Sequence, residues 1–193
     1  MIPRRPPVLL NSGGLTPDWD PKSRLNNPRN VVEIGARSIR ITHYNDRRRW
    51  RLVPTSDQWF QEAAHLVGDY WVEIQATINL NRFSANTTYA AYLIFHALRN
   101  YNKAVSFDEF DKEVFTKPIM ERLSDDDTEL FEEREGEQYE PEQGNKWREL
   151  KLGQFHCNNP DQNQQVVVVY VKETDDYKEK RGLLIAAIQL RPI

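Results

Sequence analysis

Hydrophobic and polar residues alternate along much of the chain, and the clearest run is residues 71–80. Apolar side chains occupy every second position there, from Val72 to Leu80, and polar side chains fill most of the positions between them. Successive side chains of a β-strand point to opposite faces, so this alternation predicts a strand with one solvated face. The same period predicts a half-buried strand around Ile39 and Ile41.

Other segments are apolar on both faces, which is typical of strands in the middle of a sheet. Residues 87–98 are therefore predicted as a central strand, although a buried helix would have a similar composition. A helix is expected over residues 58–67, where Ser56 or Asp57 could act as N-cap. Further strands are predicted at residues 50–53, 147–152, 165–172 and 183–190, the first stopped by Pro54.

The order of these elements predicts the fold class. Strands that do not alternate with helices argue against a parallel βαβ sheet. About eight strands and one short helix predict an all-β fold, a jelly-roll β-sandwich of two antiparallel sheets. Residues 1–30 are rich in Pro, Gly, Asn and Asp, and we expect an irregular N-terminal arm there, followed by one domain at residues 31–193.

Charge is unevenly distributed along the chain, although the formal net charge is only -3. Residues 1–51 carry eleven basic and four acidic side chains, whereas residues 121–142 carry two basic and eleven acidic ones. Such runs are most often solvated segments, and the overall charge does not by itself indicate nucleic-acid binding. The single cysteine, Cys157, favours a reducing, intracellular location. No stretch approaches the roughly 18 apolar residues of a membrane span, and no secretory signal is recognised.

The sequence contains few residues in patterns that indicate catalysis. It has no glycine-rich phosphate loop and no HExxH motif, and its four histidines lack ligand spacing, so we expect neither a metal nor a cofactor. A glycosidase would need two carboxylates facing each other across a cleft, and most carboxylates here lie in one run. An enzyme is therefore the minority interpretation, and we expect a non-catalytic protein.

The sequence Arg47-Arg48-Arg49-Trp50 has two interpretations. A basic cluster beside an aromatic ring can hold phosphates and stack on a base, and the ring can also stack on a sugar. Alternatively, the arginines form a solvated turn and Trp50 anchors it in the core, since tryptophan is usually highly buried. The residues alone leave both open.

Four blocks in order resemble the phloem protein 2-like (Nictaba-like) lectins of plants. The segment DYWVEIQATINLNRFSANTTYAAYLIFHAL at residues 69–98 is similar to the two central strands of that family. ARSIRITHYNDRRRW resembles its opening block, and WRELKLGQF and RGLLIAAIQLRPI resemble its later strands. The resemblance covers roughly residues 34–193. It implies a jelly roll that binds N-acetylglucosamine oligomers or the core of N-glycans without a cofactor, in the cytoplasm and nucleus of plant cells.

The resemblance also implies candidate site residues and partners. The family's loop tryptophans fall on His43 and Trp50, so Trp50 is expected at the surface, on the same edge as His43 and Tyr44. Weaker matches place Asn163, Tyr170 and Tyr177 among the carbohydrate-binding residues. Trp71 and Trp147 are expected to be structural. The expected partners are glycans or glycoproteins, with a homodimer formed through a sheet edge. The alternative is an RNA- or protein-interaction module that acts through the basic N-terminal region and has lost or altered sugar binding.

Overall fold

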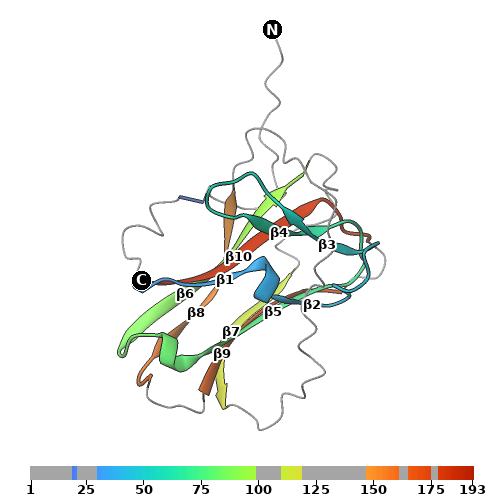
Figure 1. Cartoon of the computed structure of the whole chain (residues 1–193). Helices are drawn as coiled ribbons and strands as arrows, with labels where there is room; N and C mark the ends of the chain where they lie inside the picture. The colour runs from blue at the N-terminus through green and yellow to red at the C-terminus, as the bar shows by residue number, and fades with distance from the viewer. Residues whose placement is uncertain (1–18, 21–29, 99–109, 119–146, 161–164, 175–177) are drawn as a thin grey trace.

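Two antiparallel β-sheets face each other and enclose the main hydrophobic core (Figure 1). This computed structural model describes residues 19–20, 30–98, 110–118, 147–160, 165–174 and 178–193. No helix in the described part of the chain is long and apolar enough to cross a membrane.

The larger sheet has six strands in the order β3-β4-β10-β6-β8, and β1 also pairs with β10. These strands are β1 (Val32–Gly35), β3 (Trp50–Pro54), β4 (Glu62–Leu66), β6 (Thr87–Ala97), β8 (Arg148–Cys157) and β10 (Leu183–Pro192). Strand β10 lies inside this sheet, and every residue from Leu183 to Leu190 is buried. A run that is apolar at almost every position is what a strand covered on both faces requires.

The smaller sheet has four strands in the order β2-β5-β9-β7. They are β2 (Arg40–Ile41), β5 (Val72–Asn79), β7 (Asp111–Pro118) and β9 (Gln165–Glu173). In β5 the even-numbered side chains are buried between the sheets, and the odd-numbered ones are partly or fully exposed. Two 3₁₀ turns, η1 (Ala36–Ser38) and η2 (Leu80–Arg82), precede β2 and follow β5.

Buried side chains form two clusters, one on each face of the larger sheet. The first contains inward residues of both sheets, such as Leu93, Ile185 and Val169, and is the core of the sandwich. The second contains the alternate residues Ile94 and Leu184, together with aromatic side chains from outside the sheet. The larger sheet is therefore covered on both faces where these two clusters lie.

The predicted sandwich of two antiparallel sheets is confirmed, but the predicted helix over residues 58–67 is wrong. Residues 62–66 form β4, which pairs with both β3 and β10. Ala64 is buried between the two sheets, and its neighbour Ala63 is buried on the outer face of the larger sheet. Because both faces of this strand are buried, its apolar residues do not alternate with polar ones, and their spacing resembles that of a helix. Backbone hydrogen bonds on both sides override the helical preference of this short segment.

Candidate functional site

The loop between β2 and β3, residues 42–49, is a series of hydrogen-bonded turns. The amide of Asp46 donates to the carbonyl of His43 at 3.0 Å, and the amide of Arg49 donates to that of Asp46 at 2.8 Å. The φ angle of His43 is 62°, in the left-handed region that few non-glycine residues adopt. Such a conformation persists only where its surroundings hold it, and they often do so at functional sites.

Asp69 is the polar centre beside this loop, and its side chain is completely buried. Arg49 Nη1 lies 2.6 Å from Asp69 Oδ1, and the amide of Trp71 donates to the same oxygen at 3.2 Å. The main chain of Asp69 also pairs with that of Lys180, at 2.9 and 2.7 Å. A buried carboxylate is tolerated only when paired and hydrogen-bonded, and these contacts hold Asp69 in place.

The imidazole of His43 completes this cluster. Its Nδ1 lies 2.9 Å from Asp69 Oδ2 and 3.3 Å from Arg49 Nη1. Nδ1 can donate to the carboxylate or accept from the guanidinium, but it cannot do both at once. The shorter contact favours Nδ1–H donating to Asp69. This leaves Nε2 as the ring nitrogen without a hydrogen bond to any described residue.

A second carboxylate, Glu73, holds two aromatic side chains. Trp71 Nε1 donates to one oxygen at 3.0 Å, and Tyr170 Oη donates to the other at 3.2 Å. Burial, followed by the charge of Glu73, raises the pKa of Tyr170 to about 12, so its phenol remains a hydrogen-bond donor at neutral pH. Lys172 Nζ lies 5.5 Å from the centroid of the Trp71 ring, within cation–π range.

Tyr70 lies in the chain between the two carboxylates, Asp69 and Glu73, and is 47% exposed, more than any other described Phe, Tyr or Trp side chain. Its main-chain carbonyl accepts a hydrogen bond from Lys180 Nζ. Lys180 is itself fully buried and pairs with Glu173 at 2.6 Å. The buried Lys180 therefore fixes the main chain of Tyr70, while the Tyr70 ring remains accessible to a ligand.

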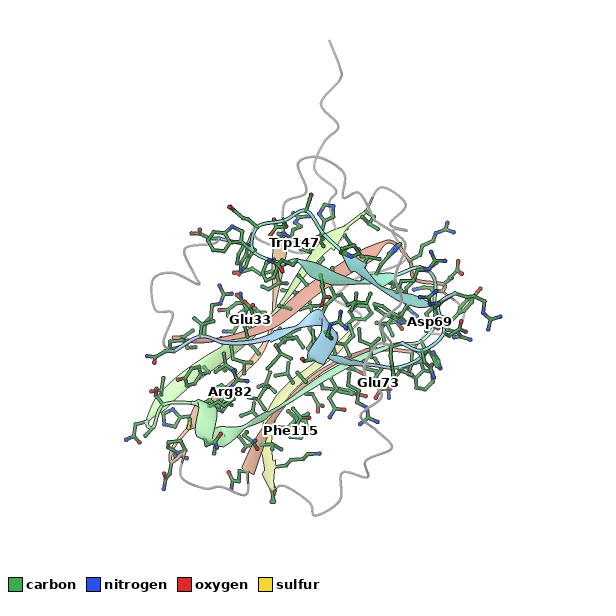
Figure 2. The ribbon with its side chains drawn as sticks, in the orientation of Figure 1. Glu33, Asp69, Glu73, Arg82, Phe115 and Trp147 are labelled. Carbon is green, nitrogen blue, oxygen red and sulfur yellow. The ribbon has the colours of Figure 1, made fainter. Side chains whose placement is uncertain are left out.

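We call these linked groups the Asp69 rim: residues 69–73 together with His43, Arg49 and Tyr170. Asp69 and Glu73 lie at the same end of the sandwich in Figure 2. The loop is joined to this end because the amide of Thr42 donates to the carbonyl of Glu73 at 3.0 Å. The rim includes an exposed aromatic ring on Tyr70, and the imidazole of His43, the guanidinium of Arg49 and the phenol of Tyr170 are held by its carboxylates. It is chemically suited to a ligand with both an apolar face and hydroxyl or amide groups.

The structure brings together only some of the residues that the sequence nominated. His43 and Tyr170 both belong to the rim, through Asp69 and Glu73. Tyr44 is half-buried and packs against the main core. Asn163 and Tyr177 lie outside the described residues.

The expectation that Trp50 lies at the surface is wrong, because its side chain is completely buried in the main core. Trp50 and Leu52 point inward from β3, and Arg51 between them is exposed. This period of two was visible in the sequence and is the signal that could have placed the ring in the core. Of the two interpretations of the arginine loop, the structure supports the turn that anchors Trp50.

Sequence reasoning did not nominate Asp69, Tyr70 and Glu73 as candidate site residues. Glu73 occupies a polar position of an alternating strand, and Asp69 and Tyr70 come directly before that strand. Nothing local indicates that the Asp69 carboxylate meets Arg49, 20 positions earlier in the chain. Trp71, expected to be structural, is half-buried and bound to Glu73. Trp147 is buried among other aromatic residues, as expected.

Comparison with known proteins identifies the family. The family model of Phloem protein 2 matches residues 29–192. The chain belongs to the phloem protein 2 family. Family membership indicates a lectin-like, carbohydrate-binding module and leaves the sugar undetermined. The family is not a known enzyme family.

Curated relatives of the chain come from Arabidopsis thaliana. The chain is 26% identical to putative F-box protein PP2-B8 over 86% of its own length and 58% of that protein's. It is 28% identical to F-box protein VBF over 82% and 64% of the two lengths, and 26% identical to F-box protein PP2-B15 over 82% and 63%. The chain thus spans about three fifths of the curated relatives that it matches.

Proposed function

We propose that the Asp69 rim binds carbohydrate and that this chain is a non-catalytic lectin for N-acetylglucosamine oligomers or the core of N-glycans. The observation that carries the proposal is the exposed ring of Tyr70, in a segment whose neighbours Asp69 and Glu73 hold two clusters of polar side chains. The family supports the class of ligand. The resemblance of the four sequence blocks supports the sugar.

The chemistry of the rim fits a sugar with an N-acetyl group. A pyranose ring presents an apolar C–H face that can stack on Tyr70, and its hydroxyls need donors and acceptors nearby. Arg49 supplies N–H donors, and His43 Nε2 can accept a hydrogen bond when Nδ1 donates to Asp69. Because Asp69 holds both side chains in place, little conformational entropy is lost when a ligand binds.

The carboxylates of the rim support binding rather than hydrolysis. Both oxygens of Asp69 and both oxygens of Glu73 are engaged by protein donors. A glycosidase needs one carboxyl group free to give a proton and another free to attack or to activate water. In the rim, the carboxylates instead orient the groups that would touch a ligand.

The remaining parts of this proposal rest on the family resemblance. They are glycoprotein partners in the cytoplasm and nucleus, a homodimer formed through a sheet edge, and contributions from Asn163 and Tyr177. Light scattering would test the dimer, and imaging of the tagged protein in plant cells would test the location. Tyr44 remains a candidate at the margin of the rim, whereas Trp50 is too deeply buried to stack on a ligand.

Paired variants test the proposal directly. Glycan-array screening followed by calorimetry with chito-oligosaccharides measures binding to the intact chain. Tyr70→Ala should weaken binding about threefold to tenfold, since an aromatic stacking contact contributes roughly 0.5–1.5 kcal/mol. Phe115→Ala is the matched control, because Phe115 is another exposed aromatic side chain, 39% accessible, on β7 outside the rim. Absence of binding to every glycan, or equal losses in the two variants, would refute the proposal.

A second candidate function is an interaction module for RNA or an acidic protein. The observation that favours it is the exposure of Arg47 and Arg48 in the β2–β3 loop and of Arg51 in β3. Phosphate contacts release counterions, so RNA affinity should fall steeply as salt is added, whereas binding of a neutral sugar should not. A salt titration of whichever ligand binds therefore distinguishes the two functions.

A further inference from the structure

A tryptophan from the N-terminal part of the chain is buried against the outer face of the larger sheet. Trp19 and Asp20 are the described residues that precede residue 30, and Trp19 is only 6% exposed. It packs on Phe60, with ring centroids 4.8 Å apart, and meets the edge of Trp59 at 6.1 Å. Phe60 in turn packs against Trp147 at 5.3 Å. We call Trp59, Phe60, Trp147 and Gln189 the tryptophan socket.

The socket recognises the indole by a hydrogen bond as well as by its shape. Trp19 Nε1 donates to Gln189 Oε1 at 3.1 Å, and Gln189 is completely buried. The other end of that amide, Nε2, donates to a carboxylate oxygen of Glu33 at 2.7 Å. Because an ionised carboxylate can only accept, it orients the amide so that Oε1 faces the indole. The socket therefore offers an acceptor that a tryptophan satisfies and a phenylalanine does not.

The main chain of Trp19 is also bound. The amide of Trp19 donates to the carbonyl of Trp147 at 2.8 Å. A main-chain hydrogen bond combined with a side-chain pocket is the usual way in which a folded domain binds an extended peptide. In the sequence, Trp19 stands between Pro17 and Pro21, and prolines restrict the backbone around the residue that is recognised.

The socket is separate from the Asp69 rim. Trp147 and Asp69 lie at different parts of the sandwich in Figure 2. The socket is built on the outer cluster of the larger sheet, whereas the rim joins the β2–β3 loop to the smaller sheet. A ligand could therefore occupy one without contacting the other.

We propose that the socket is a binding site for a tryptophan-bearing peptide, and that Trp19 occupies it as a tethered ligand rather than as a part of the sandwich. The first strand of the sheets, β1, begins only at Val32. Tethering raises the local concentration of a weak ligand, so the chain's own segment fills the socket without high intrinsic affinity. When the segment leaves, the buried acceptor on Gln189 loses its partner, which favours capture of another indole.

A peptide added in trans tests this proposal. The full-length Trp19→Ala chain is titrated with a synthetic peptide of residues 14–24, GLTPDWDPKSR, and binding is followed by calorimetry and by the thermal unfolding midpoint. The peptide should bind this variant one-to-one and raise its midpoint. It should bind the unmutated chain far more weakly, because that socket is already occupied.

Peptide variants and a second protein variant make the test specific. A peptide carrying Trp19→Phe should bind at least about threefold more weakly because it lacks the indole donor, and a Trp19→Ala peptide should not bind. Adding Trp71→Ala to the Trp19→Ala chain should leave peptide binding unchanged, because Trp71 lies in the rim. Equal binding to the occupied and emptied sockets, or no binding to a folded Trp19→Ala chain, would overturn the proposal. A Trp19→Ala chain that does not fold would also overturn it, because Trp19 would then be an integral part of the core.

Discussion

Replacing Trp50 tests whether its ring is a core residue or a surface on which a ligand stacks. The ring is completely buried and belongs to the main core, where its strand pairs with β4 at Leu66. Truncating a buried tryptophan to alanine costs roughly 3–5 kcal/mol of stability. In a domain of this size each kcal/mol shifts the unfolding midpoint by about 2–4 °C, so Trp50→Ala should lower it by about 6–20 °C.

A milder substitution refines the prediction. Trp50 Nε1 is buried without a hydrogen-bond partner among the described residues. An unsatisfied buried donor costs about 1–3 kcal/mol, and Trp50→Phe removes that donor while leaving a smaller cavity than alanine would. We therefore expect Trp50→Phe to be much less destabilising than Trp50→Ala, with a loss below about 2 kcal/mol.

Chemical denaturation gives these free energies directly. Urea unfolding of the original chain and both variants yields the midpoint and the slope, and an unchanged slope shows that only stability has changed. Glycan binding is measured below the unfolding transition, so that every chain compared is folded. If Trp50→Ala keeps the original midpoint but loses glycan binding, the ring is a ligand platform and the burial argument is refuted.

Three further predictions concern the Asp69 rim and the groups beneath it. Asp69→Asn should weaken glycan binding and cost about 1–3 kcal/mol, less than a deeply buried pair because the Arg49 side chain is 40% exposed; calorimetry and urea unfolding measure the two effects. Lys180→Met should cost about 3–5 kcal/mol in urea unfolding because it removes the ammonium that is ion-paired with buried Glu173, and adding Glu173→Leu should recover part of that loss. The Tyr170 phenol should titrate near pH 12 in the absorbance difference between the chain and Tyr170→Phe. Because this pKa is raised above its ordinary value of 10, the stability it contributes is complete below pH 10 and is lost as the pH rises towards 12; a difference titration near pH 10 would contradict the proposed environment.

Local patterns predicted the strands, because strand periodicity depends on neighbouring residues alone. The alternation of residues 71–80 and the continuous apolar run of residues 183–190 correspond to β5 and β10. The helix prediction failed at residues 62–66 because their strand conformation comes from pairing with β3 and β10, which are distant from them or outside the local pattern. Asp57 does bind the amide of Phe60 at 2.9 Å as an N-cap would, but no helix follows.

The candidate site was predictable only where a resemblance supplied it. His43 and Tyr170 were nominated in that way and lie in the rim. The contact of Lys180 with the carbonyl of Tyr70 joins residues 110 positions apart, and no local pattern encodes such a pairing. Polar networks of this kind depend on the tertiary fold, and sequence periodicity carries no information about their partners.

The most direct test of the central claim is to map the ligand on the protein by NMR. Backbone amide shifts of the isotopically labelled full-length chain are followed while an N-acetylglucosamine oligomer is added. The account predicts saturable shifts concentrated in residues 42–49 and 69–73 and around Tyr170, with little change around Trp147. Shifts that saturate elsewhere, or none up to the solubility limit of the sugar, would contradict it.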